Sequence, residues 1–288
     1  MRKYFVQTYE YAKNNWVSVL LHILIPAILY TVFINPTSSF DYIMTNIKEL
    51  DAQHAYQIFL TINDGSKWAS WEYILFYFLM AAVTLIVFSS FIGNIQNKMR
   101  YGKTVYEGFK GVFIRTNENF FATLRAGIAL IVAMEFYALI MSVVIYFIIK
   151  VTAIAALRII LVSLIGGGII IAMFYGAAWV TCVIPNMTMR NEGLFKSIKR
   201  SMSMVKEKQI KIFGNFAIPI VVCFIPLLVL SGFDIVYDHI ILTIVRYAFI
   251  FLFYVFSFAY YIILMYVVFF DVNEIEREDL NAQNKWRI

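Results

Sequence analysis

The stretch Tyr247 to Phe270 reads YAFIFLFYVFSFAYYIILMYVVFF and contains no charged residue. An α-helix rises 1.5 Å per residue and needs about 20 apolar residues to cross the hydrocarbon core of a bilayer, so this stretch is long enough to span it. Glu135 is the only Asp, Glu, Lys or Arg within five further stretches of the same kind. These stretches cover residues 14–40, 73–97, 126–149, 159–189 and 212–233.

The composition indicates that lipid surrounds most of this chain. Hydrophobic residues make up 61% of it and charged residues 15%, against about 45–50% and 25% in soluble domains. The apolar residues form long blocks, and the polar segments between them are too short for an independent soluble core. We therefore predict an all-α polytopic membrane protein with one domain, residues 1–288. Its six transmembrane helices are expected at about 16–36, 72–94, 124–149, 159–184, 212–232 and 244–270.

The positions of the basic residues predict the orientation of the six spans. With the amino terminus inside, 19 of the 24 Lys and Arg residues fall in inner segments, as the positive-inside rule requires. An odd number of spans would move one basic cluster to the outer side. We therefore expect a cytoplasmic membrane protein with both termini in the cytoplasm. This topology accounts for the net charge of +6, so no nucleic acid partner is predicted.

A short amphipathic segment precedes the first, third and fifth spans, and this order of helix plus hairpin suggests a three-fold repeat. Such segments are expected to lie in the headgroup plane on the cytoplasmic side. In the third segment the predicted apolar face comprises Leu194, Ile198, Met202 and Val205, opposite Glu192, Lys196, Lys199 and Lys206. Basic residues of the second and third segments are our candidates for a face that binds lipid headgroups or a partner. They are Lys103, Lys110, Lys196, Lys199, Arg200 and Lys206.

Glu135 lies near the middle of the third span, where an ionisable group is costly and is a functional candidate by default. His22 in the first span and Arg246 near the outer end of the sixth are the partners considered for it. One interpretation is a proton or cation relay, and the other is a neutral acid that hydrogen-bonds between helices. We favour the second, because a relay normally contains several acidic or histidine residues.

Gly168, Ala172 and Gly176 form a stripe of small residues at a spacing of four in the fourth span. Such stripes let helix backbones approach closely in lipid. Packing within the monomer is the favoured interpretation, and a dimer face or a thin wall beside a substrate path are the alternatives.

Sequence motifs for catalysis or metal binding are not found. The chain has no Gly-rich phosphate loop, no H-E-x-x-H and no nucleophile elbow, so no catalytic residue is assigned. Cys182 and Cys223 fall within or at the end of expected spans, where thiols behave as small hydrophobes. No cofactor and no metal are predicted.

The segment GLFKSIKRSMxxVK at residues 193–206, IP at 184–185 and YxxAKxNW at 9–16 resemble a group of six-span bacterial families. These are the membrane domain fused to glycerophosphoryl diester phosphodiesterases, the YciC-like proteins and related families of unknown function. The resemblance covers most of the chain and implies a prokaryotic cytoplasmic membrane protein of six helices. It does not imply hydrolysis, because no counterpart of the fused catalytic barrel is found in this sequence.

The function that we predict is that of a non-enzymatic membrane accessory or scaffold protein. It would bind membrane lipids, another membrane protein or a second copy of itself, mainly through its basic cytoplasmic face. The first alternative is a transporter or permease subunit that uses Glu135 and spans kinked by Pro26, Pro219 and Pro226. The second is an intramembrane lipid-modifying enzyme.

Overall fold

The computed structural model describes residues 2–34, 36–37, 71–103, 108–152, 154–237 and 240–280. About 90% of the structure is helical, and the described residues contain no strand. Six helical segments are long and apolar enough to cross a membrane, which confirms the predicted all-α polytopic fold. They are Trp16–Phe33, Ile74–Tyr101, Lys110–Ile148, Gly167–Arg190, Gln209–Asp234 and Ile240–Val272.

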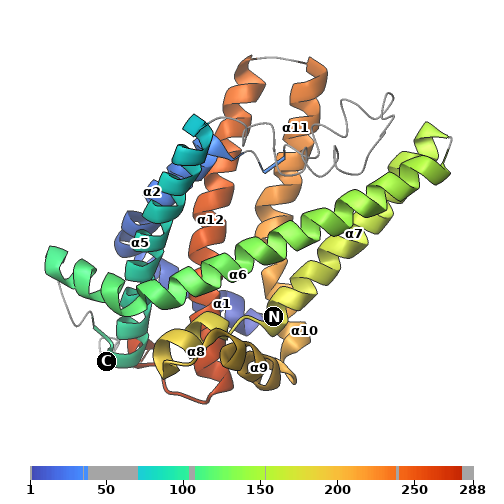
Figure 1. Cartoon of the computed structure of the whole chain (residues 1–288). Helices are drawn as coiled ribbons and strands as arrows, with labels where there is room; N and C mark the ends of the chain where they lie inside the picture. The colour runs from blue at the N-terminus through green and yellow to red at the C-terminus, as the bar shows by residue number, and fades with distance from the viewer. Residues whose placement is uncertain are drawn as a thin grey trace.

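From residue 71 onward the helices that make up these segments follow one another with short connections (Figure 1). The chain begins with a short helix, α1 (Arg2–Asn14), which leads into the first span. The spans contain α2 (Trp16–Phe33), α5 (Trp71–Tyr101), α6 (Gly108–Val151), α7 (Ala155–Trp179) with α8 (Val183–Arg190), α10 (Gln209–Phe216) with α11 (Ile225–Tyr237), and α12 (Ile240–Val272). Between α8 and α10 lies a second short helix, α9 (Leu194–Val205).

The helix α12 occupies the centre of the bundle and contacts α1, α2, α5, α8 and α11 (Figure 1). Its sequence is apolar on almost every side, a pattern shared by buried helices and by helices in contact with lipid. Residues 262–270 are almost completely buried, except for the half-buried Met265. The most apolar window of α12 is 39% buried, against 17% for that of the third span. Most side chains of the other spans are therefore available to lipid.

The helices α5 and α6 approach each other closely at Gly93. A Cβ atom built on Gly93 would lie 2.8 Å from Cβ of Arg115 and 2.9 Å from Nδ2 of Asn119. Real Cβ contacts are longer than this, so only glycine fits at this crossing. The contact places the basic amino-terminal part of α6 directly against α5.

The helix α6 is continuous over 44 residues, and at 1.5 Å per residue it is about 66 Å long. This is about twice the thickness of a hydrocarbon core, so α6 extends beyond it or is strongly tilted. Figure 1 shows α6 crossing the bundle obliquely and projecting from it with α7. The amphipathic segment expected before the third span is thus not a separate helix from residue 108 onward. Residues 104–107 lie outside the described residues.

The small-residue stripe of α7 does not pack within the described part of the chain. Gly168, Ala172 and Gly176 are exposed, and no atom lies within 4 Å of a Cβ built on either glycine. The opposite side of α7 faces the bundle, where Ala178 is buried and Phe174 packs against the core. The larger side chain of Phe174 buries more apolar area than the stripe would, which explains this orientation.

The fifth span departs from regular α-helix between its two prolines. Residues Ile220–Phe224 form a π-helical turn, η2, which follows Pro219 and precedes Pro226. Proline lacks a backbone N–H and prevents the normal hydrogen bond one turn back, so a local change of helix type is expected here.

Candidate functional site

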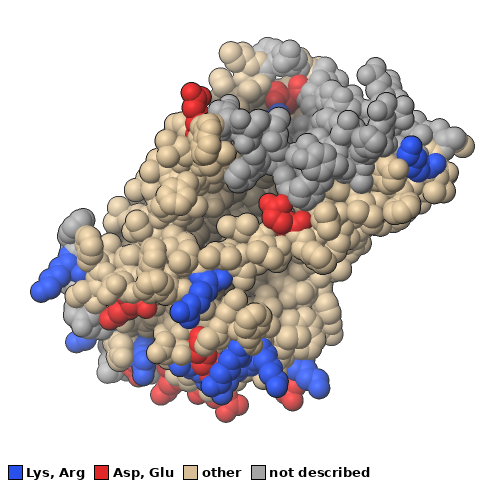
Figure 2. All heavy atoms as spheres, viewed as in Figure 1, with Lys and Arg blue, Asp and Glu red and all other residues tan. Residues whose placement is uncertain are grey.

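One end of the bundle carries a dense group of polar contacts between helices. It comprises α1, α8, α9, residues 206–209 and residues 271–280, and we call it the basal layer. In Figure 1 these elements lie together at the lower end of the molecule. Figure 2 shows that charged side chains gather at this end, whereas the surface over the spans is mostly uncharged.

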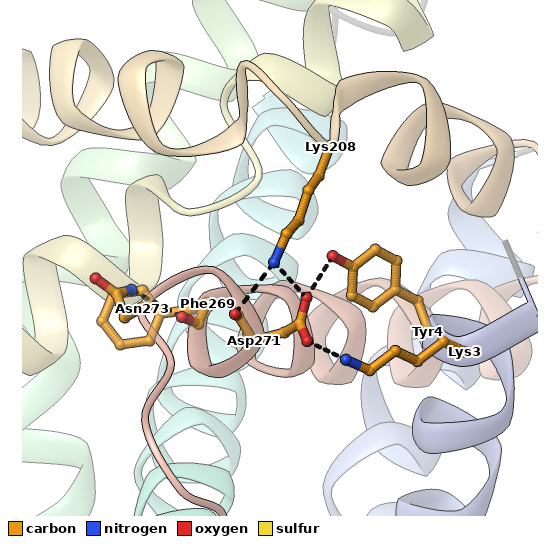
Figure 3. A network of polar contacts seen from close by, with 6 residues as sticks. All are labelled: Lys3, Tyr4, Lys208, Phe269, Asp271 and Asn273. Carbon is orange, nitrogen blue, oxygen red and sulfur yellow. Dashed lines mark hydrogen bonds and ion pairs between the residues drawn. The ribbon is translucent and has the colours of Figure 1, made fainter.

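Asp271, at the end of α12, is the centre of a polar network that ties three parts of the basal layer together (Figure 3). The Tyr4 hydroxyl donates a hydrogen bond of 2.7 Å to Oδ2 of Asp271. Nζ of Lys208 lies 2.9 Å from the same oxygen, and Lys3 forms an ion pair with the other oxygen. The network joins α1 and the segment before α10 to the end of the central helix.

Burial favours the protonated form of the Tyr4 phenol, which can donate a hydrogen bond. Desolvation by burial raises the pKa of Tyr4 well above its usual range, and the adjacent Asp271 carboxylate raises this pKa further. The Tyr4 phenol therefore stays protonated and continues to donate to Asp271 at any physiological pH. Tyr11 lies about two turns further along the same face of α1 and is also buried, and desolvation raises its pKa as well.

Side-chain hydrogen bonds connect α9 to the residues before α8, and the end of α8 to the residue after α12. Oγ of Ser201 accepts a 3.0 Å hydrogen bond from the backbone N–H of Cys182 and donates one of 2.8 Å to the carbonyl of Trp179. Arg190, the last residue of α8, donates a hydrogen bond to the side chain of Asn273, which follows α12. The helix α9 is thus fixed at the level where the fourth and sixth spans end.

The predicted faces of α9 are partly wrong. Its buried face comprises Ser197, Ser201 and Val205, while Met202, assigned to the apolar face with Val205, is 44% exposed on the side of Lys199 and Lys206. Glu192, assigned to the polar face with the lysines, is 9% exposed and pairs with Arg200. The small side chains of Ser197 and Ser201 let α9 approach α7 and α8 closely, and Ser201 supplies hydrogen bonds there. Larger apolar residues are therefore displaced from this contact.

The outward face of α9 combines apolar and basic side chains. Phe195 is 85% exposed, and Lys199, Met202 and Lys206 are exposed on the same side. At 3.6 residues per turn these four positions lie within about 60° of one another. Ile210, at the start of the fifth span, is also exposed.

The six basic candidate residues divide between two places. Lys103 follows α5 and Lys110 lies in the first turn of α6, and both are exposed. The other four, Lys196, Lys199, Arg200 and Lys206, belong to α9 and the residue after it. Arg200 is committed to Glu192, and Lys196 lies 3.8 Å from the same carboxylate while remaining largely exposed. Among the described residues, Lys199 and Lys206 form no ion pair.

The three intramembrane polar residues have different surroundings. His22 contacts the carbonyl of Ser18 at 2.7 Å and the hydroxyl of Ser90 at 3.2 Å. Arg246 forms an ion pair of 2.8 Å with Asp234 across the α11–α12 hairpin. Glu135 lies on an exposed side of α6. The grouping of Glu135 with His22 and Arg246 stays a prediction.

Sequence reasoning missed Asp271 and Asp234. The signal for Asp234 was available, because it and Arg246 flank a short loop between two spans and carry opposite charges. Asp271 stands at the first charged position after a long apolar run, but its partners Lys3 and Lys208 are remote in sequence. Within the described ranges, no cluster of three or more His, Cys, Asp or Glu residues could hold a metal ion.

Comparison of this chain with models of protein families, with curated proteins and with solved structures finds no match. The resemblance to the phosphodiesterase-linked membrane domain and the YciC-like proteins therefore stays a prediction. The functional interpretation depends on the geometry of the chain itself.

Proposed function

We propose that this multi-pass membrane protein is a non-enzymatic accessory or scaffold protein whose basal layer faces the cytoplasm and binds lipid or a partner complex. The observation that carries this proposal is the outward face of α9, with Lys199 and Lys206 exposed beside Phe195 and Met202. An exposed surface of mixed charge and apolar area is typical of interaction sites and is costly to leave in water.

The contacts beneath this face support a stable platform. Ser201 and Glu192 fix α9 from its inner side, and the Asp271 network fixes the segment that follows it. The exposed lysines are consequently presented on a helix whose position is set by buried hydrogen bonds, as a binding surface requires.

The test is to extract the full chain with its surrounding membrane in polymer-bounded nanodiscs and to measure the lipid classes and proteins that remain with it. Wild type is expected to retain anionic lipid above its bulk proportion or a stoichiometric protein. Lys199→Glu combined with Lys206→Glu should reduce that retention several-fold. Arg200 is left intact because its reversal would disrupt the internal pair with Glu192.

The control is Lys150→Glu, which makes a charge reversal of the same kind at one position, in the last turn of α6. It should leave the retained lipid and protein unchanged. The proposed function would be contradicted if the lipid retained with the wild-type chain had the composition of the bulk membrane and no other protein were retained.

A second candidate function, transport, is favoured by the π-helical turn η2 in the fifth span. Such turns within α-helices often occur at functional sites, and the exposed Glu135 on α6 is the acid that a proton-coupled route would use. Transport predicts that Glu135→Gln abolishes a proton-dependent flux in liposomes at equal protein incorporation. Unchanged flux would eliminate this candidate.

A further inference from the structure

We infer that the outward face of α9, defined by Phe195, Lys199, Met202 and Lys206, binds the anionic headgroup layer of the bilayer in which the chain is embedded. This inference rests on the proposed function and deepens it, because it selects a lipid surface as the ligand of the basal layer.

The depth of α9 is the first reason. The helix connects two spans through short segments, residues 191–193 before it and residues 206–208 after it. Arg190, which precedes α9 in the sequence, contacts Asn273, and Lys208, which follows α9, contacts Asp271. Both partners lie at the end of the central helix α12, where it leaves its apolar stretch. The helix α9 is therefore held at the level of the headgroups.

The chemistry of the outward face is the second reason. Phe195 is 85% exposed and Met202 is 44% exposed, and both are suited to insertion at the boundary between headgroups and acyl chains. On the same side of the helix, Lys199 lies between Phe195 and Met202, and Lys206 lies one turn after Met202. Long lysine side chains can extend from an apolar surface to lipid phosphates.

The continuation of the chain is the third reason. Ile210 is 72% exposed at the beginning of the fifth span, and Val221 and Val222, further along this span, are each 58% exposed. These exposed side chains of the fifth span have lipid as their solvent. Lys206 and Lys211 are exposed on either side of Ile210, so positive charge is concentrated where the span enters the bilayer.

The experiment uses the full chain with Cys182→Ala and Cys223→Ala, labelled with an environment-sensitive fluorophore after Phe195→Cys. The protein is reconstituted in vesicles of phosphatidylcholine alone or of equimolar phosphatidylcholine and phosphatidylglycerol. Lipids with a spin label near the headgroup report contact with the bilayer, and iodide reports contact with water. Because Phe195 is almost fully exposed, its replacement leaves the buried face of α9 intact.

The expected result is strong quenching by the spin-labelled lipid and protection from iodide in phosphatidylglycerol vesicles. Lys199→Glu with Lys206→Glu should weaken lipid contact by at least about five-fold, since each lysine near an anionic surface contributes about that factor. Lys150→Glu should have no effect.

Free access of iodide to the label in both kinds of vesicle would overturn the inference. Lipid quenching that is independent of both phosphatidylglycerol and charge reversal would overturn the anionic requirement. These failures differ from a failure of the proposed function, because a protein partner retained through Lys199 and Lys206 in nanodiscs would still support the proposed function.

Discussion

The close approach of α5 and α6 at Gly93 provides a sharp test of how the basic start of α6 is positioned. In Gly93→Ala the new Cβ would lie 2.8 Å from Cβ of Arg115. The Arg115 Cβ is attached to the backbone and cannot rotate away, so the two helices must separate by about 0.6 Å to reach an ordinary contact of about 3.4 Å. Overpacking of this kind costs about 1–3 kcal/mol.

The assay is the thermal unfolding of the detergent-solubilised full chain, followed by intrinsic fluorescence. Since 1 kcal/mol corresponds to about 2–4 °C in chains of about 200 residues, Gly93→Ala should lower Tm by several degrees. Gly176→Ala is the matched control, because no atom lies within 4 Å of its Cβ position, and its Tm should stay the same or rise slightly. Equal Tm values for wild type and Gly93→Ala would refute the described crossing of α5 and α6.

Three further substitutions test polar contacts in the same unfolding assay. Asp271→Asn should lower Tm, because it removes the carboxylate that holds α1 and Lys208 to α12. The decrease in Tm should be smaller at high salt. An unchanged Tm would argue against this network. Ser201→Ala should cost about 1–3 kcal/mol by leaving the N–H of Cys182 unpaired, whereas the exposed Ser203→Ala should be nearly neutral. Asp234→Asn should cost about 3 kcal/mol, since the ion pair with Arg246 is largely buried, and stability equal to wild type would contradict that pairing.

The number and approximate positions of the spans could be predicted because lipid requires long uninterrupted apolar runs. The central place of α12 was not foreseen. All six runs satisfy the same requirement, and a helix in contact with lipid is as apolar as one in contact with other helices. Only the packing of α1, α2, α5, α8 and α11 around α12 distinguishes it.

If α9 lies at a membrane surface, as we propose, its orientation shows why amphipathic patterns are less informative there. In water the apolar face of an amphipathic helix turns inward, and the sequence pattern places Met202 on one apolar face with Val205. In the structure the inward positions are Ser197 and Ser201, and Phe195 and Met202 face outward. A lipid surface removes the penalty for exposing apolar side chains, so close packing and hydrogen bonding can decide which face turns inward.

The candidate site was predictable as a set of basic residues but not as a geometry. Lys199 and Lys206 are exposed as expected. Arg200 was placed in the same group, but it forms an ion pair with the buried Glu192. That pairing depends on the turn between α8 and α9, where Asn191 adopts a left-handed conformation with φ of 53°.

The most direct test of the central claim is the sidedness of two positions in intact cells. In a chain with Cys182→Ala and Cys223→Ala, single cysteines are introduced by Lys103→Cys and Lys150→Cys and treated with a membrane-impermeant thiol reagent. With six spans and a cytoplasmic basal layer, Lys150→Cys is labelled from outside, and Lys103→Cys is labelled only after the membrane is opened. Labelling of Lys103→Cys from outside, or solubility of the purified chain without detergent, would contradict the account.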